Sequence, residues 1–283
     1  MLRFGIYVLQ DAPWPEIARR ARAAEESGLD TIWVADHSRD FRDPTGVWLD
    51  GWATLAALAT QTSHVRVGTL VANPILRPPS TLALQALTLD HLSAGRFDLG
   101  IGTGIARFDH AATGTPYWSA GERAARFAEY LRVVDGLLRS AEQPFELEGR
   151  FYGTSGLSMH PPPTQRPRPP ITVGGQSPTV RRLAAEIAEC WNTHGPFGAS
   201  IDEILEITTR QNAELDELCS AAGRDPRTLR RSLLCFGALD PWTSGGPIDD
   251  LVSRFREVGI TEFVFFWPPD GRLEPLERVM RAA

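Results

Sequence analysis

Residues 65 to 104 place the strongest constraint on the fold of this chain. An apolar run, Val65–Val71, is followed by an amphipathic stretch, Ser80–His91, and then by a second apolar run, Arg96–Ile101. A strand, a crossover helix and a second strand make a parallel βαβ unit whose strands are buried on both faces. Ligands of such units collect at the carboxyl ends of the strands, so the residues after each run are candidates for a functional site.

The same alternation of apolar and amphipathic stretches continues along all 283 residues. The predicted strands are Arg3–Val8, Thr31–Ala35, Val65–Val71, Arg96–Ile101, Pro170–Val173, Cys190–Thr193, Ser232–Ala238 and Glu262–Trp267. The predicted helices are Pro15–Ser27, Gly51–Thr62, Ser80–His91, Gly121–Ser140, Pro178–Glu189, Ile201–Ala222, Ile248–Val258 and Pro275–Met280. This order favours one α/β domain over residues 1–283, a (β/α)8 TIM barrel, with a doubly wound open sheet as the competing layout.

Two segments interrupt the alternation. Residues 141–169 end in a Pro-rich run from Pro161 to Pro170, and we expect a surface excursion there, such as a small hairpin. Residues 103–120 are polar and predict a long loop. Long βα loops of a barrel usually carry its site.

Composition excludes several classes of function. A net charge of -6 argues against nucleic acid and against an anionic membrane as partners. No apolar run approaches the ~20 residues needed to span a bilayer, and the first residues are strand-like, so we expect a cytoplasmic protein without a signal peptide. The chain contains no lysine, which removes Schiff-base chemistry and leaves Arg, backbone N–H groups and hydroxyls to bind any anion.

Asp36 and His37 directly follow the second predicted strand. A carboxylate and an imidazole at a strand's carboxyl end can orient a ring or move a proton near neutral pH. The alternative is that Asp36 only caps the loop and His37 only packs. His37 is the candidate catalytic residue, and no metal site is expected because the His and Cys spacing matches no common metal motif.

Glycines follow two other strands. Gly174, Gly175, Gln176 and Ser177 lie between the fifth predicted strand and a helix, where converging N–H groups and the helix dipole favour a phosphate. The alternative is a tight βα turn. The segment Gly102-Thr103-Gly104 follows the fourth strand and strengthens the ligand hypothesis.

These residues belong to a wider pattern. The chain resembles the bacterial luciferase-like monooxygenase superfamily, and within it the short single-chain members that use coenzyme F420 or FMN. The resemblance rests on Phe4-Gly5-Ile6, Trp33-Val34-Ala35-Asp36-His37, Gly68-Thr69-Leu70-Val71, Thr88-Leu89-Asp90-His91-Leu92-Ser93-Ala94-Gly95-Arg96, Leu99-Gly100-Ile101-Gly102-Thr103-Gly104, Pro167-Arg168-Pro169-Pro170-Ile171-Thr172-Val173-Gly174-Gly175 and Ala188-Glu189-Cys190-Trp191-Asn192. It covers nearly the whole chain.

The resemblance implies a cofactor ring at the carboxyl-terminal mouth of the barrel. A cis non-prolyl peptide near Leu70 and Val71 would back the ring, and Asp36 and His37 would contact it. The family pattern further implies that Gly102, Thr103 and Gly104 pass the ring or its tail. It places the phosphate at Gly174, Gly175, Gln176 and Ser177.

The function implied by the resemblance is hydride transfer between coenzyme F420 and a small organic substrate. Glucose 6-phosphate is rejected, because the glucose-6-phosphate dehydrogenases of this group have a catalytic Glu where this chain has Ile105 and use lysines that it lacks. One alternative is an FMNH2-dependent two-component monooxygenase fed by a separate flavin or F420 reductase. A second is a flavin-binding barrel without turnover. A homodimer is expected.

Overall fold

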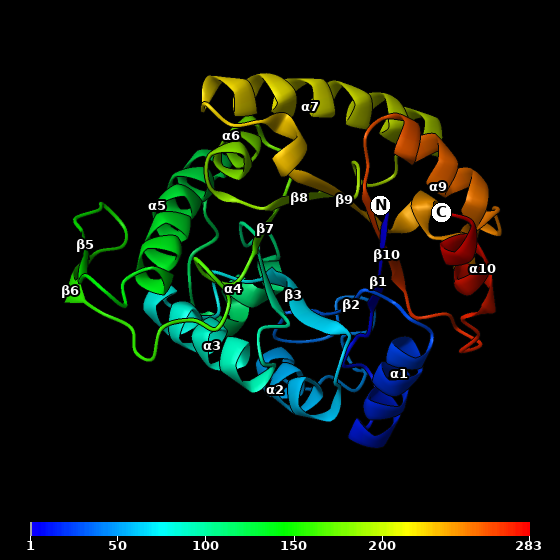
Figure 1. Ribbon diagram of the computed structural model, residues 1–283, viewed down its shortest axis with the longest axis horizontal. Helices are drawn as coiled ribbons and strands as arrows, with labels where there is room; N and C mark the ends of the chain where they lie inside the picture. Colours follow the sequence, from blue (N-terminus) through cyan, green and yellow to red (C-terminus); the bar gives the residue numbers. More distant parts are fainter. Residues whose placement is uncertain (1) are drawn as a thin grey trace.

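The computed structural model describes residues 2–283 and shows a closed barrel of eight parallel strands (Figure 1). In spatial order the strands are β1 (Arg3–Tyr7), β10 (Glu262–Phe266), β9 (Arg230–Cys235), β8 (Cys190–Thr193), β7 (Ile171–Gly174), β4 (Phe97–Ile101), β3 (Arg66–Ala72) and β2 (Thr31–Val34). Pairing of the first strand with the last closes the barrel, with Phe4 opposite Phe263. The prediction of a TIM barrel is confirmed.

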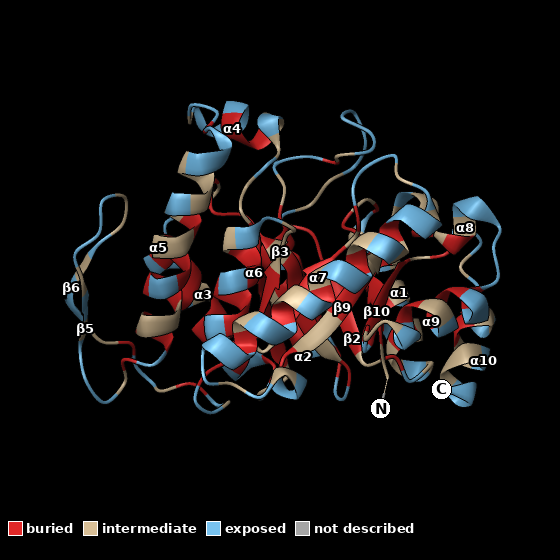
Figure 2. Ribbon diagram, turned by 90° about the horizontal axis from the view of Figure 1, so that it is seen from above, coloured by how far each residue is buried: buried red, intermediate tan, exposed pale blue. Residues whose placement is uncertain are grey.

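Helices surround the barrel on its outer side (Figure 1). They are α1 (Trp14–Glu26), α2 (Gly51–Gln61), α3 (Pro79–Leu92), α5 (Ala120–Leu138), α6 (Pro178–Ile187), α7 (Ile201–Ala221), α9 (Ile248–Glu257) and α10 (Glu274–Ala282). Figure 2 shows the buried residues concentrated in the strands and on the helix faces that cover them. Strands enclosed on both faces explain why the sequence reads as continuous apolar runs and not as alternating ones.

Glycines end helices where the chain turns back into a strand. Gly28 and Gly259 follow α1 and α9 with φ of +77° and +97°, a backbone region that a Cβ disfavours. These two positions belong to the repeated helix-to-strand connection of the barrel. Their conformation confirms the boundaries predicted there.

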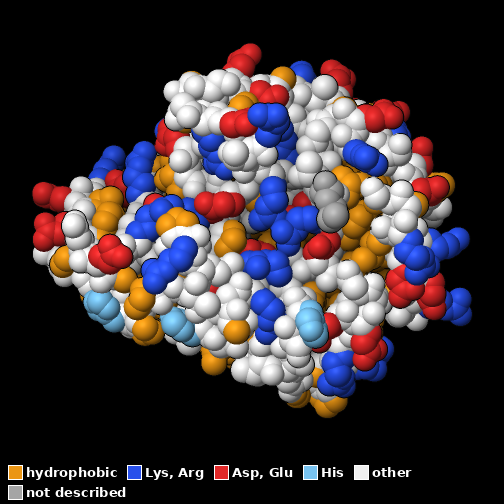
Figure 3. All heavy atoms as spheres, viewed as in Figure 1, with side chains coloured by type: hydrophobic (Ala, Val, Ile, Leu, Met, Phe, Trp, Pro, Cys, Tyr) orange, Lys and Arg blue, Asp and Glu red, His pale blue; other side chains and the backbone are white. Residues whose placement is uncertain are grey.

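The amino-terminal end of the barrel is closed by ion pairs. Arg66 Nε lies 2.7 Å from Asp98, and Arg230 lies 2.5 Å from the buried carboxylate of Glu262. On the face that holds the strand starts, Figure 3 shows basic side chains gathered near the centre. Groups at this end of a barrel serve stability, so the functional site is sought at the opposite end.

The predicted interruptions differ in outcome. Residues 141–169 contain the antiparallel pair β5 (Phe145–Leu147) and β6 (Thr154–Leu157), which confirms the expected hairpin and stands beside α5 (Figure 2). The prediction of a loop over residues 103–120 was wrong in part, because α4 (Arg107–Thr113) lies within it. A helix of seven residues is too short to show a periodic apolar face in the sequence.

The region around β9, the seventh barrel strand in chain order, also differs from the prediction. The strand was expected at Ser232–Ala238, but β9 begins at Arg230 and ends at Cys235. Its charged start is stabilised by Arg230 pairing with Glu262, and its predicted end forms the 3-10 helix η2 (Gly237–Leu239). Two further short helices, α8 (Pro241–Ser244) and η1 (Pro226–Thr228), were not predicted. Within residues 2–283 no helix combines the length and apolar character that crossing a bilayer requires.

Candidate functional site

The carboxyl ends of the strands meet at one mouth of the barrel. In Figure 2 this mouth lies on the side of α4, opposite the amino terminus. The segments predicted as site residues all lie at this end: after β2, in β3, after β4 and after β7. The parallel strand order therefore brings together residues that are up to 141 positions apart, from Asp36 to Ser177.

His37 is held by a carboxylate that the sequence did not single out. Its Nδ1 atom lies 2.7 Å from Oδ2 of Asp109, which belongs to α4. The side chain of Asp109 is completely buried, whereas that of His37 is 29% exposed. If Nδ1 carries the proton that Asp109 accepts, Nε2 is left as the ring atom available to a bound molecule.

Asp109 is further held by three donors. The backbone N–H and the hydroxyl of Ser38 donate to Oδ1 at 2.8 and 2.7 Å, and Nδ2 of Asn73 donates to Oδ2 at 2.7 Å. Burial acts to raise the pKa of Asp109, but hydrogen bonds from His37 and Ser38 outweigh it and the pKa lies below its ordinary value. Asp109 is therefore a fixed negative charge behind the imidazole.

Asp36 faces the protein interior. Its side chain is 2% exposed, pairs with the guanidinium of Arg77, and accepts a hydrogen bond of 2.7 Å from the backbone N–H of Asn73. These contacts support the alternative in which Asp36 holds a loop. Contact of Asp36 with a cofactor ring stays a prediction. His37, by contrast, stands at the mouth and is not buried.

The third strand carries an irregular backbone at the mouth. The peptide between Leu70 and Val71 is cis, as the family resemblance implied, and the pairing of β3 with β4 shifts register between Thr69 and Ala72. The hydroxyl of Tyr7 donates to the carbonyl of Leu70. Burial raises the pKa of Tyr7 far above its ordinary value, so the hydroxyl keeps its proton and remains a donor.

Two predicted glycines make room for the side chain of Val71. A Cβ at Gly102 would lie 2.4 Å from Val71 Cγ2, and a Cβ at Gly174 would lie 2.9 Å from Val71 Cγ1. Glycine is therefore needed at both positions, because the side chain of Val71 occupies the space that a Cβ would take. Close approach of Gly102, Thr103 and Gly104 to a ligand stays a prediction.

The segment Gly174–Ser177 has the groups that a phosphate requires. Ser177 caps α6 by accepting from the N–H of Val180. Within residues 2–283, the backbone N–H groups of Gln176, Ser177 and Thr179 have no hydrogen-bond acceptor. Uncommitted N–H groups at the positive end of a ten-residue helix fit a phosphate group.

Side chains behind this segment fix its shape. Arg181 of α6 donates to the carbonyl of Gln176, and Nε1 of Trp191 donates to the carbonyl of Gly175 at 2.8 Å. Gln176 itself donates through Nε2 to the carbonyl of Gly195 at 2.7 Å. With its carbonyls turned toward protein donors, the segment can direct its N–H groups outward.

Aromatic rings line the mouth on two sides. Beside His37, the rings of Phe41 and Phe108 lie 5.6 and 5.3 Å from the imidazole. Across the mouth, the ring of His194 lies 6.2 Å from that of Phe236. Burial lowers the pKa of His194 below its ordinary value, so this imidazole is uncharged near neutral pH. Both walls favour a largely apolar, flat ligand.

No group of three or more His, Cys, Asp or Glu side chains placed to hold a metal ion occurs among the described residues. Sequence reasoning missed Asp109, Asn73 and Arg77. All three follow a strand and lie in segments already suspected of carrying the site. The sequence therefore shows that these three residues follow strands, but it does not show which side chains they contact.

The structure is a closed parallel barrel whose candidate site residues gather at the carboxyl ends of its strands. The family model described as luciferase-like monooxygenase matches residues 2–240, and the chain belongs to this family. It is thus a luciferase-like oxidoreductase.

Individual proteins show how far the similarity extends. The uncharacterized protein Rv0953c of Mycobacterium tuberculosis (strain ATCC 25618 / H37Rv) is 32% identical over 268 residues, which make up 89% of this chain and 86% of that protein. The F420-dependent hydroxymycolic acid dehydrogenase of the same strain is 30% identical over 225 residues, 79% of this chain and 59% of that enzyme. A solved F420-dependent secondary alcohol dehydrogenase in complex with an F420-acetone adduct has a TM-score of 0.83 at 19% identity, covers 99% of this chain and 98% of its own, and shows the shared fold.

Proposed function

We propose that this protein transfers a hydride between coenzyme F420 and a small organic substrate. The observation that carries the proposal is the His37–Asp109 pair, which presents an oriented imidazole at the same mouth of the barrel as the cis peptide of Leu70 and Val71. The F420-dependent dehydrogenase that is 30% identical over 79% of this chain supports the choice of cofactor.

Different groups at the mouth would bind different parts of the cofactor. F420, when bound, would supply or accept the hydride. The free N–H groups of Gln176, Ser177 and Thr179 would hold its phosphate, and the backbone at Leu70 and Val71 would support one side of its ring. The aromatic walls would exclude water from the reacting atoms.

His37 would hold or move the proton that accompanies hydride transfer to or from a carbonyl or alcohol carbon. Its Nε2 atom would face the substrate oxygen, because Nδ1 is engaged by Asp109. Asp109 would fix the ring orientation and stabilise the imidazolium that forms when Nε2 takes a proton. Asn73 would hold both carboxylates in place, because its backbone N–H donates to Asp36 and its side-chain amide donates to Asp109.

An FMNH2-dependent monooxygenase is the second candidate, and the family description favours it. That reaction would need reduced flavin from a separate reductase. Oxygen consumption that is coupled to loss of substrate would identify it. A flavin-binding barrel without turnover would instead bind the cofactor tightly and convert no substrate.

The test is a titration of the purified protein with F420 and with FMN, each oxidised and reduced, followed by tryptophan fluorescence. We expect F420 to bind with a Kd of about 1 μM or below and FMN to bind at least about tenfold more weakly, a difference of about 1.4 kcal/mol. Preference for reduced FMN would establish the monooxygenase function instead. Binding of neither would overturn the assignment of a flavin-type cofactor.

A further inference from the structure

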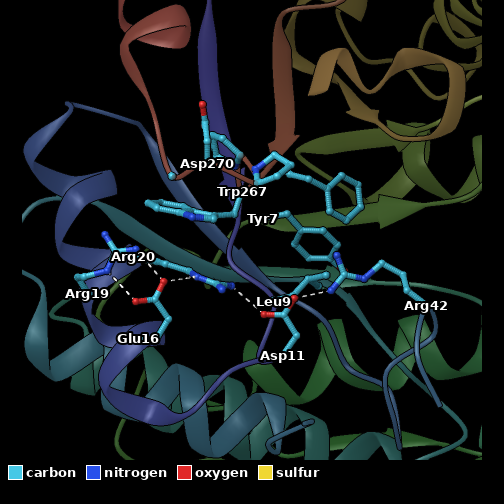
Figure 4. Close-up of a pocket in the computed structure, with 13 residues that line it drawn as sticks. Tyr7, Leu9, Asp11, Glu16, Arg19, Arg20, Arg42, Trp267 and Asp270 are labelled. Carbon is cyan, nitrogen blue, oxygen red and sulfur yellow. Dashed lines mark hydrogen bonds and ion pairs between the residues drawn. The ribbon is translucent and has the colours of Figure 1, made fainter. Parts of the chain in front are cut away.

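A hollow lies beside the mouth, between β1, α1 and the segment that follows β10 (Figure 4). Its volume is about 330 Å³. We propose that this cavity binds an uncharged organic molecule with an apolar body and a hydroxyl or carbonyl oxygen; calling that molecule the substrate rests on the function proposed above. The inference is carried by the position of the cavity, by its apolar wall and by the pairing of its charges.

The cavity shares a side chain with the backbone irregularity of the mouth. Tyr7 lines the cavity, and its hydroxyl donates to the carbonyl of Leu70, at the start of the cis peptide. The ring of Phe266, which also lines the cavity, meets the Tyr7 ring edge to face with centroids 5.2 Å apart. A molecule in the cavity would therefore lie next to the candidate ring site.

One wall of the cavity is apolar and runs on to the rim. Leu9, Trp267 and two prolines line it together with Phe266. From Phe266 the aromatic contacts continue to Phe236, with centroids 5.8 Å apart, and then to Phe197 at 5.7 Å. Phe197, at the outer end of this row of rings, is 69% exposed. These contacts form a continuous row of aromatic rings from the cavity wall to an exposed side chain.

The opposite wall is charged, and its arginines pair with its carboxylates except for Asp270, which is 61% exposed and pairs with Arg272 outside the cavity. Three arginines and three carboxylates line the cavity. Arg20 lies 2.7 Å from Asp11 and 3.0 Å from Glu16, and Arg19 lies 2.7 Å from Glu16. Arg42 pairs with Asp11 from the other side. Figure 4 shows these side chains as a chain of ion pairs across the floor, beneath the ring of Trp267.

The charge pairing decides the class of ligand. An anion that displaced Asp11 or Glu16 from its arginine would leave that carboxylate without a partner, and a cation that took either carboxylate would leave an arginine without one. An uncharged ligand can rest its apolar body on Trp267 and accept a hydrogen bond through a hydroxyl or carbonyl oxygen from an arginine N–H. The guanidinium carbons of Arg19 and Arg20 lie 5.9 and 6.0 Å from the Trp267 ring, so the arginines are close enough to reach such an oxygen.

Three probes with the same hydrocarbon cage separate the charge classes: adamantan-1-ol, adamantane-1-carboxylate and adamantan-1-ammonium. Binding is measured by calorimetric titration of the protein without cofactor. We expect the alcohol to bind at least about tenfold more tightly than either ion, because an ion gives up its hydration for a lining that already holds charges of both signs. In Trp267→Ala we expect alcohol binding to weaken at least about fivefold through loss of the stacking surface.

A variant that should bind one probe more tightly gives a stricter test than a variant that only loses binding. In Asp11→Asn, Arg42 and Arg20 lose a carboxylate, so the carboxylate probe should bind at least about fivefold more tightly than it does to the unmodified protein. The alcohol should change less than about twofold in that variant. Asp225→Asn, at an exposed pair far from the cavity, is the matched control and should change neither probe.

Three outcomes would overturn the inference: absence of alcohol binding, carboxylate binding equal to alcohol binding in the unmodified protein, or indifference of all probes to both cavity variants. Because no cofactor is present, these outcomes are independent of the F420 titration. Loss of the F420 assignment would leave a confirmed cavity site intact. Loss of the cavity site would leave a confirmed cofactor intact.

Discussion

His37 and Asp109 are 72 positions apart in the chain, yet Nδ1 of the imidazole lies 2.7 Å from a carboxylate oxygen of Asp109. The first residue follows β2 and the second lies in α4, after β4. The barrel order β2, β3, β4 places Asn73 between them, where it donates to Asp109 through its side chain. The pair gives the mouth one oriented imidazole backed by a buried negative charge.

Replacement of His37 by alanine should slow turnover far more than it weakens cofactor binding. Loss of a proton-transfer group typically costs about 10²–10⁴-fold in rate, so we expect kcat to fall within that range. Cofactor Kd should change less than about threefold, because backbone groups elsewhere would hold the phosphate. Steady-state kinetics and a fluorescence titration measure the two quantities. His64→Ala is the control, since that side chain is 91% exposed; unchanged kcat in His37→Ala would remove His37 from the mechanism.

Asp109→Asn should reduce kcat through His37 without removing it. The amide has the size of the carboxylate but cannot stabilise an imidazolium, and it can favour the wrong imidazole tautomer. We expect kcat to fall about 10-fold or more, with KM little changed and with the pH at which activity is half lost shifted downward on the acid side. A pH–rate profile of both proteins checks this. A uniform fall in kcat at every pH would indicate a structural role only.

The same carboxylate should contribute to stability in a pH-dependent way. The pKa of Asp109 is lower in the folded protein than its ordinary value, so the stability it provides is present above the unfolded pKa of about 3.9 and is lost as pH falls through the folded pKa. Asp109→Asn should therefore destabilise the protein by about 1–3 kcal/mol near pH 7, and this difference should shrink below about pH 4. Urea unfolding at pH 7 and at about pH 3 measures it. A difference that grows on acidification would contradict the assigned direction of the pKa.

The sequence was sufficient for the barrel but only partly for the site. Buried parallel strands leave apolar runs that can be read directly, whereas the seven-residue helix α4 leaves no periodic face. Asp109 could not be paired with His37, because that contact depends on which loops the barrel order brings together. Gly102 and Gly174 were predicted to contact a cofactor, which stays a prediction. The room that both make for Val71 could not be predicted, because the direction of that side chain depends on a backbone irregularity.

Gly102→Ala should disrupt the mouth, because the new Cβ would lie 2.4 Å from Val71 Cγ2 and a valine side chain has little rotational freedom. We expect a loss of about 1–3 kcal/mol of unfolding free energy and weaker cofactor binding. Gly121→Ala is the matched control. It lies in α5 with no atom within 4 Å of the place that the new methyl group would take, so it should stabilise the protein by about 0.5–1 kcal/mol. Equal unfolding midpoints for the two variants would show that Val71 adjusts freely.

Asp36 and Arg77 should behave as one energetic unit. Both side chains are nearly buried, at 2% and 10% exposed, and each is the other's ionic partner. Arg77→Met should cost about 3–5 kcal/mol of unfolding free energy, because it leaves the Asp36 charge buried without a cation. Adding Asp36→Asn to that variant should recover part of the loss, since the uncompensated charge is gone. Urea unfolding of the two single variants and the double variant measures the coupling, and Arg227→Met, at an exposed ion pair, should leave the midpoint unchanged. Losses that add within about 0.5 kcal/mol would mean that Asp36 is stabilised mainly by the N–H of Asn73.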